Sequence, residues 1–329
     1  MEKQKVVVIG GGTGTYNILQ GLKKLPFDIT AIVTMSDSGG SSGLLRDEFG
    51  VLPPGDVRQC LAALSDGGEP DILRELFLYR FDKGNGLCGH NFGNLLLTAL
   101  TDIVGSEDKA IKYASKLLRI HGTVLPVTVD NTNLCCEYED GFVVKGEHKI
   151  DEPHHNGYIA IKNAWLEPKG DVTKDVVKAI EESLLVILGP GDLYTSIIAN
   201  LLVNGVGEAL LNKKTLYVAN LISKYGQSYK YNLKDHVKDI EKYLGHNLDY
   251  ILMNDEKLPK SILNKYAKEG GYAVMNDMIE DERVVSSPMI AGEVFKNKKG
   301  DVLKRSMIRH DGDKLASEVY KIVQSLVEF

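Results

Sequence analysis

Apolar and polar positions follow a β-α-β rhythm at the start of the chain. Val6–Ile9 and Ile29–Val33 are short apolar runs rich in β-branched residues, as expected of strands buried on both faces. Between them, Ile18, Leu19 and Leu22 recur at helical spacing. A parallel return through a short helix predicts a sheet with helices packed on its faces.

The same rhythm returns in the second half of the chain. Strands are predicted at Leu184–Leu188, Leu216–Ala219 and Tyr250–Met253. Helical spacing predicts helices at Val176–Ile180, Thr195–Leu202, Val237–Leu244 and Asp313–Leu326, and four more within residues 56–120. This pattern predicts an α/β protein.

The period changes to two between residues 123 and 166. Cys135–Tyr138 and Phe142–Val144 flank Glu139-Asp140-Gly141, which is a hairpin signal. We expect one α/β domain over residues 1–329, with residues 123–166 as a β-rich excursion from the main sheet.

Composition narrows the class of protein. Of 329 residues, 43% are hydrophobic, and 39 basic against 45 acidic residues give a net charge of -6. A nucleic-acid partner is therefore not expected. The longest apolar runs are far shorter than the ~20 residues of a membrane-spanning helix, so no membrane insertion is expected.

The cysteines and the N-terminus bear on the compartment. The cysteines are Cys60, Cys88, Cys135 and Cys136, and none forms a CxxC pair. We expect reduced, mostly buried thiols in a reducing environment. The N-terminal residues show no secretion signal, which favours a cytoplasmic protein.

The first candidate site is the glycine loop after the first strand. Its candidate ligand-binding residues are Gly11, Gly12, Thr13 and Gly14. Such a loop lets phosphate approach the amides at a helix N-terminus. Thr15 stands where the dinucleotide fingerprint needs its last glycine, which argues against a nicotinamide oxidoreductase, and no Walker lysine follows. The alternative is a tight turn without a ligand.

The second candidate is the loop after the second strand, within residues 36–43. Its candidates are Asp37, Ser38, Gly39, Gly40, Ser41 and Ser42. A run of small polar residues is not expected to form core and offers amides and hydroxyls to a phosphate or sugar. Asp37 is suited to a ribose hydroxyl or to Mg2+. The alternative is a disordered solvent loop.

Two helix starts add candidates. Asp56 fits an N-cap, and Arg58 lies close enough to reach an anionic ligand. His90, Asn91 and Asn94 cluster before a strongly apolar helix, where a ligand contact is expected. No metal-ligand spacing and no Ser/His/Asp set can be assigned among them.

A later loop repeats the design of the first. Its candidates are Gly189, Pro190, Gly191, Asp192 and Thr195, although Asp192 or Thr195 can also simply cap the helix that follows. Loops at the carboxyl ends of parallel strands face one crevice, so residues 10–15, 36–43, 189–196 and 220–228 should meet there. The set is suited to holding a phosphorylated nucleotide rather than attacking one.

Five motifs in this order resemble the gluconeogenesis factor (YvcK-like) family, within the superfamily of 2-phospho-L-lactate transferase (CofD-like). They are Gly10-Gly11-Gly12-Thr13-Gly14, Asp37-Ser38-Gly39-Gly40-Ser41-Ser42-Gly43, Pro54-Gly55-Asp56-Val57-Arg58, Gly89-His90-Asn91-Phe92-Gly93-Asn94-Leu95 and Gly189-Pro190-Gly191-Asp192-Leu193-Tyr194-Thr195-Ser196. The resemblance covers essentially the whole chain.

The resemblance implies a Rossmann-like three-layer α/β/α fold with a mainly parallel sheet. It implies a UDP-sugar ligand such as UDP-N-acetylglucosamine, a homodimer, and a regulatory role in cell-shape and cell-wall maintenance on gluconeogenic carbon sources. The alternative is the transferase branch, which uses a nucleotide-diphosphate-activated donor.

The resemblance also points to Asn220, Ser223, Tyr266 and Arg309, with Tyr266 stacking on a base and Arg309 pairing with a diphosphate. The chain departs from the family pattern at three other positions. Ser38 replaces an acid, which weakens a Mg2+ site; Asp192 replaces a serine; Gln227 replaces a glutamate.

Overall fold

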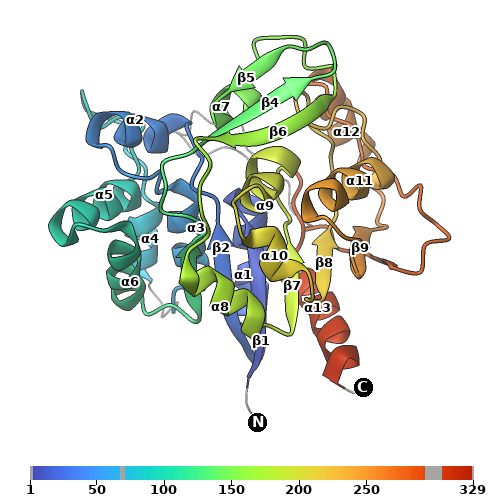
Figure 1. Cartoon of the computed structure of the whole chain (residues 1–329), viewed down its shortest axis with the longest axis horizontal. Coiled ribbons are helices and arrows are strands. Elements are labelled where there is room, and N and C mark those ends of the chain that lie inside the picture. Colours follow the sequence, from blue (N-terminus) through green and yellow to red (C-terminus); the bar gives the residue numbers. More distant parts are fainter. Residues whose placement is uncertain (1–2, 67–70, 293–305, 328–329) are drawn as a thin grey trace.

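A seven-stranded parallel sheet forms the centre of the protein (Figure 1). The computed structural model describes residues 3–66, 71–292 and 306–327. In spatial order the strands are β10 (Val284–Ser287), β9 (Tyr250–Asn254), β8 (Thr215–Val218), β7 (Leu185–Leu188), β1 (Gln4–Gly10), β2 (Phe27–Val33) and β3 (Thr123–Pro126). The predicted mainly parallel sheet is confirmed.

Each face of this sheet has its own hydrophobic core. Successive side chains of a strand point to opposite faces, so Val6 and Val8 of β1 enter one core while Val7 and Ile9 enter the other. All four are almost completely buried. The continuous apolar run of β1 is thus explained by burial on both sides.

Helices cover both faces and complete three layers. The Val6 face carries α1 (Gly12–Leu22), α3 (Gly55–Leu64), α4 (Ile72–Leu78), α5 (Phe92–Val104), α6 (Glu107–Leu118) and α13 (Gly312–Val327). The Ile9 face carries α8 (Lys174–Glu182), η1 (Leu193–Ile198), α9 (Ala199–Leu201), α10 (Val206–Leu210) and α11 (Leu233–Leu244). Two further helices are α2 (Gly40–Phe49) and α12 (Lys260–Lys268). The predicted Rossmann-like architecture is confirmed.

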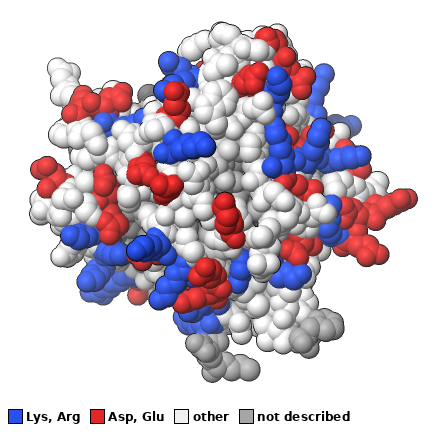
Figure 2. Space-filling model, in the orientation of Figure 1, with Lys and Arg blue, Asp and Glu red and all other residues white. Residues whose placement is uncertain are grey.

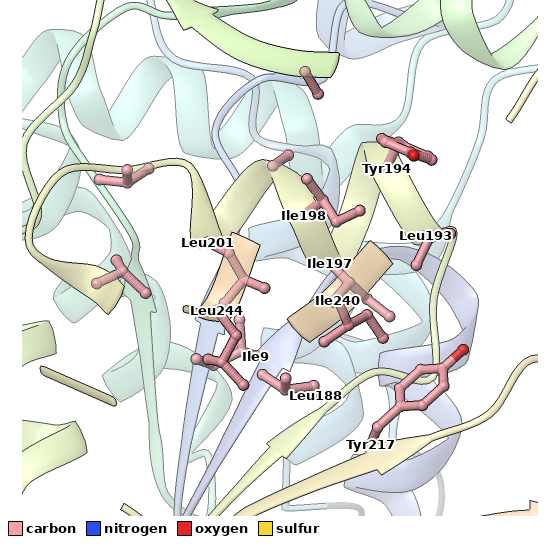
Figure 3. Close-up of a cluster of buried hydrophobic side chains, with 14 of the residues drawn as sticks. Ile9, Leu188, Leu193, Tyr194, Ile197, Ile198, Leu201, Tyr217, Ile240 and Leu244 are labelled. Carbon is pink, nitrogen blue, oxygen red and sulfur yellow. The ribbon is translucent and has the colours of Figure 1, made fainter. Parts of the chain in front are cut away.

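Figure 3 shows part of the core on the Ile9 face. Ile9 and Leu188 meet Ile197 of η1 and Ile240 of α11, all fully buried. The helix predicted over Thr195–Leu202 starts earlier and begins as π-helix. The Ile197 amide donates to the Asp192 carbonyl, five residues back (3.1 Å), which widens this turn.

A small antiparallel sheet stands over the carboxyl ends of the main strands (Figure 1). Its strands, in spatial order, are β5 (Val143–Lys145), β4 (Asn133–Tyr138) and β6 (Ile161–Glu167), and α7 (Glu147–Asp151) follows β5. The predicted hairpin is present as β4 and β5. The excursion begins later than residue 123, because β3 pairs with β2 in the main sheet.

Two further expectations concern the cysteines and the membrane. All four cysteines are free thiols, and only Cys88 among them is exposed. None of the helices in the described ranges combines the length and apolar character needed to cross a membrane.

Candidate functional site

The first and the later glycine loop meet where the strand order reverses, between β1 and β7. A Cβ placed on Gly14 would lie 2.3 Å from the Pro190 carbonyl oxygen, so only glycine permits this approach. The Thr15 hydroxyl is buried and donates to the Gly11 carbonyl (3.1 Å). Thr15, which stands where the dinucleotide fingerprint has its last glycine, therefore stabilises the conformation of the first loop.

A cavity of about 570 Å³ opens at this switch point. All four loops expected at the carboxyl edge contribute to its lining. The predicted residues that line it are Gly11, Gly12, Thr13, Gly14, Asp37, Gly39, Ser41, Ser42, Asp56, Arg58, Asn94, Pro190, Gly191, Asp192, Thr195, Asn220, Ser223, Tyr266 and Arg309.

The other predicted residues lie behind the lining: Ser38, Gly40, His90, Asn91 and Gly189. Their side chains and backbone support the wall. The Asn91 side chain caps α5 by accepting from the Gly93 amide (2.9 Å). His90 pairs through Nδ1 with the Ser41 hydroxyl (3.2 Å), which itself accepts from the Asn91 amide (3.3 Å). These contacts are structural.

The serine-rich stretch is a loop over residues 36–39, as predicted, but residues 40–43 are helical, which corrects the prediction for that half. α2 begins at Gly40, and Ser41 and Ser42 are buried. Both hydroxyls accept from the Asn94 side-chain amide, at 3.3 and 3.4 Å. Small polar residues can be buried here because a neighbouring amide satisfies them.

Arg58 is part of the same buried network. Only 5% of its surface is exposed, and its Nε donates to Asn94 Oδ1 (2.8 Å). The guanidinium therefore links α3 to α5 at the cavity wall. Its predicted contact with an anionic ligand stays a prediction.

Asp56 does not cap α3, which corrects a second prediction. The N-cap position is Pro54, and Asp56 lies inside the first turn. Its Oδ1 instead accepts from the Gly12 amide at the start of α1 (2.9 Å). The Asp56 carboxylate thus binds the first glycine loop, although Asp56 and Gly12 are 44 positions apart in sequence.

α7 spans the cavity between loops of the main sheet. At the N-terminal end of α7, the Ser38 amide donates to the Glu147 carboxylate (3.4 Å), and the His148 amide donates to the Ser38 hydroxyl (3.0 Å). At its C-terminal end, Asp151 binds Lys224 and accepts from the side-chain amide (Nε2) of Gln227 (3.0 Å). Sequence reasoning missed the α7 residues, because only the folded hairpin brings them to the site.

The carboxyl groups around α7 have shifted pKa values. Burial, followed by the charges of Asp37 and Asp151, raises the pKa of Glu147 well above its usual 4.5. Burial also raises the pKa of Asp151, although the Lys224 charge opposes this. Burial alone would lower the pKa of Lys224, but Asp192 and Asp151 outweigh it and raise that pKa.

The Mg2+ contact expected at Asp37 stays a prediction. Asp37 Oδ1 accepts from the Gly39 amide (2.8 Å), which shapes its own turn. Within the part of the chain that the structure describes, no group of three His, Cys, Asp or Glu side chains is placed to hold a metal ion.

The far wall of the cavity carries the remaining candidates. Asn220 Nδ2 donates to the Gly191 carbonyl (2.8 Å), which joins the loops after β8 and β7. The Tyr266 hydroxyl accepts from the Met307 amide (2.7 Å), and Arg309 is held at Nε by the Ser306 carbonyl (3.3 Å). Beside them, burial lowers the pKa of His310 to about 4, so its imidazole is neutral at pH 7.

The parallel sheet, with a cavity at its switch point, defines a Rossmann-like α/β protein whose candidate site lies at the carboxyl edge. The chain belongs to the CofD family: residues 6–294 match the family described as 2-phospho-L-lactate transferase CofD.

Relatives refine this assignment. The chain is 42% identical to the gluconeogenesis factor of Bacillus subtilis, over 96% of this chain and 97% of that protein. It is 39% identical to the gluconeogenesis factor of Halalkalibacterium halodurans, over 97% and 96% of the two chains. A crystal structure of a UPF0052 family member from Bacillus halodurans matches with a TM-score of 0.87 and 36% identity, covering 97% and 99%. The resemblance drawn from the motifs is confirmed.

Proposed function

We propose that the protein binds a nucleotide sugar, such as UDP-N-acetylglucosamine, and acts as a regulator rather than as an enzyme. The observation that carries this proposal is the cavity at the β1/β7 switch point, built from two glycine loops and two polar loops. Its volume of about 570 Å³ lies within the ordinary range of small-molecule sites.

The lining chemistry supports a polar, hydroxyl-rich ligand. Two glycines, two hydroxyl residues and an asparagine are among the residues that line it: Gly11, Gly191, Thr195, Ser223 and Asn220. Acidic and basic side chains are interspersed over the face shown in Figure 2, a distribution suited to a small-molecule ligand rather than a nucleic-acid backbone.

The biological role we propose follows the relatives. Two of them are named gluconeogenesis factor. We propose the same role for this chain, in the cytoplasm, in cell-shape and cell-wall maintenance during growth on gluconeogenic carbon sources. We also propose that the protein forms a homodimer. Light scattering would then give a mass twice that of the 36.2 kDa chain.

A second candidate function is transfer from a nucleotide-diphosphate-activated donor. It is favoured by the match to the family described as 2-phospho-L-lactate transferase. Turnover of a guanosine or uridine diphosphate donor that depends on Mg2+ would support this candidate over the regulatory one.

Thermal unfolding with a ligand panel tests the proposal. The panel contains UDP-N-acetylglucosamine, UDP-glucose, UDP, GDP, GTP and NAD, each with and without Mg2+. A ligand at 100 times its dissociation constant adds about 2.7 kcal/mol of stability. We expect a rise in melting temperature with UDP-sugars and no turnover afterwards; a rise with guanine nucleotides alone would contradict the proposal.

A further inference from the structure

His310 is a buried side chain in the cavity wall, and one of its ring nitrogens is unpaired. Only 7% of its surface is exposed, and it is among the residues that line the cavity. Among the residues that the structure describes, none makes a hydrogen bond to the buried His310 Nε2. Buried polar atoms are normally paired, so an unpaired one in a cavity wall requires an explanation.

The backbone that carries His310 is held on both sides. Residues 309–311 pair with residues 289–291 through backbone hydrogen bonds of 2.8 and 3.0 Å. The His310 carbonyl also accepts from Asn17 Nδ2 of α1 (3.5 Å), which joins this segment to the helix after the first glycine loop. The segment that carries the imidazole is therefore in place before a ligand binds.

Burial determines the charge of this imidazole and the groups that suit it. It lowers the pKa of His310 to about 4, so the ring is neutral at pH 7. A neutral imidazole has one N–H donor and one acceptor nitrogen. A hydroxyl can donate or accept, so it can pair with this ring in either tautomer. An ionised phosphate only accepts and favours a charged imidazolium, which burial of the ring disfavours.

The ring can offer a nitrogen to the cavity without any change in the backbone. The torsion about the Cβ–Cγ bond of histidine is broad and roughly two-fold. A half-turn about this bond exchanges ring nitrogens with ring carbons and keeps the shape of the side chain. A ligand hydroxyl at the cavity wall can therefore select the orientation in which a nitrogen faces it.

We propose that His310 is a ligand contact of the cavity, and that its imidazole pairs with a hydroxyl of a sugar ring of the bound molecule. The inference rests on the proposed nucleotide-sugar function. It adds to that function a residue that favours the sugar over the phosphates. In the unliganded protein the unpaired ring lowers stability, and the ligand supplies the missing partner.

Two variants of His310 and one control separate these effects. His310→Leu removes both ring nitrogens, whereas His310→Gln keeps a donor and an acceptor. The matched control is His236→Leu. His236 is also buried, and its Nε2 has no partner within the described ranges either, but its Nδ1 bonds to the Asn232 carbonyl (2.9 Å) and it does not line the cavity.

Thermal unfolding of the unliganded proteins tests whether the ring is unpaired. We expect His310→Leu to match or exceed the melting temperature of the wild type, because an apolar side chain replaces an unpaired polar one. His236→Leu should melt below the wild type, because it loses a hydrogen bond. A His310→Leu variant that loses as much as His236→Leu would overturn the unpaired ring, and this comparison needs no nucleotide.

Calorimetry with UDP-N-acetylglucosamine tests the contact itself. We expect His310→Leu to bind about tenfold more weakly than the wild type, His310→Gln to lose less, and His236→Leu to keep its affinity. Equal affinities in the wild type and both His310 variants would overturn this inference and leave the proposed function intact. A wild type that does not bind the nucleotide sugar would end both.

The charge of the bound ring distinguishes a hydroxyl from a phosphate partner. A nitrogen-proton correlation spectrum of the histidine side chains at pH 7 reads that charge, and the His310 signals are those lost in His310→Gln. We expect the signals to shift when UDP-N-acetylglucosamine binds and to keep the pattern of a neutral ring. The pattern of an imidazolium in the complex would assign the contact to the diphosphate and overturn the hydroxyl pairing.

Discussion

The Lys224 ammonium lies 2.7 Å from Oδ2 of Asp192 and also binds the Asp151 carboxylate. These three side chains belong to the loop after β8, the loop before η1, and α7. One cation therefore ties the helix that spans the cavity to its wall. Asp192 departs from the family pattern and adds negative charge beside the glycine loop, and Lys224 compensates that charge.

Replacing Lys224 by methionine should leave two carboxylates facing each other. The side chains of Lys224, Asp151 and Asp192 keep 33%, 26% and 40% of their surface exposed, so solvent screens the loss. We expect a loss of about 1 kcal/mol in the free energy of unfolding rather than the 3–5 of a fully buried pair. Urea unfolding at pH 7 measures it.

The double variant Asp192→Ser/Lys224→Gln provides the control for this ion cluster. It removes one carboxylate together with the cation, so it should lose less stability than Lys224→Met. A double variant that loses as much as the single one would show that charge compensation is not the reason for the pairing.

The raised pKa of Glu147 predicts a pH-dependent stability. Its folded-state pKa lies above the unfolded value of 4.5, because burial and the Asp37 charge disfavour ionisation. Its stability contribution is therefore complete below pH 4.5 and is lost as pH rises through the folded-state pKa. Glu147→Gln should remove this loss, so the variant gains stability relative to wild type as pH rises above 4.5.

An exposed glutamate supplies the control for that pH series. A hydrogen bond from Lys5 lowers the pKa of Glu182. The difference between wild type and Glu182→Gln should then have the opposite sign, with stability lost as pH falls. Urea midpoints across the series measure both variants, and parallel curves for Glu147→Gln and wild type would contradict the prediction.

Ile197 should carry a large share of the packing beneath the glycine loop. It is completely buried between β1, β7 and α11 (Figure 3). Ile197→Ala should cost about 2–5 kcal/mol of unfolding free energy through lost burial and a cavity. Ile103→Ala is the matched control, because Ile103 is 78% exposed and its loss should stay within about 0.5 kcal/mol.

The close approach at Gly14 predicts a selective defect. An alanine Cβ would meet the Pro190 carbonyl oxygen at 2.3 Å, so Gly14→Ala must push the two glycine loops apart. We expect a loss of about 1–3 kcal/mol and weaker ligand binding. In contrast, Gly207→Ala in α10 meets no atom closer than 3.9 Å and should gain about 0.4–1 kcal/mol. Thermal unfolding compares the two, and equal effects would refute the close-approach argument.

The sequence was sufficient where apolar spacing determines structure. The strand at Val6–Ile9, the hairpin around Asp140 and the closing helix at 313–326 all follow from local periodicity and are present. α2 was missed because Ser41 and Ser42 are polar, and their burial depends on Asn94 from another helix. Local patterns contain no information about such a distant partner.

The candidate site, like the fold, could be predicted from the sequence only in part. Glycine loops at strand ends can be predicted, because parallel strands bring their carboxyl ends together. Asp56 was placed as a cap, since its partner Gly12 is 44 residues away. Glu147 and Asp151 were not selected at all, because α7 reaches the cavity only through the fold of the small sheet.

The most direct test of nucleotide-sugar binding is a calorimetric titration of UDP-N-acetylglucosamine into wild type and Asn220→Ala. Asn220 lines the cavity and links the loops after β7 and β8, whereas Asn204→Ala removes an exposed amide bonded to Asp171 away from it. We predict saturable binding to wild type and Asn204→Ala, and weaker binding to a folded Asn220→Ala. Equal affinities in all three proteins, or no heat of binding in the wild type, would contradict the account.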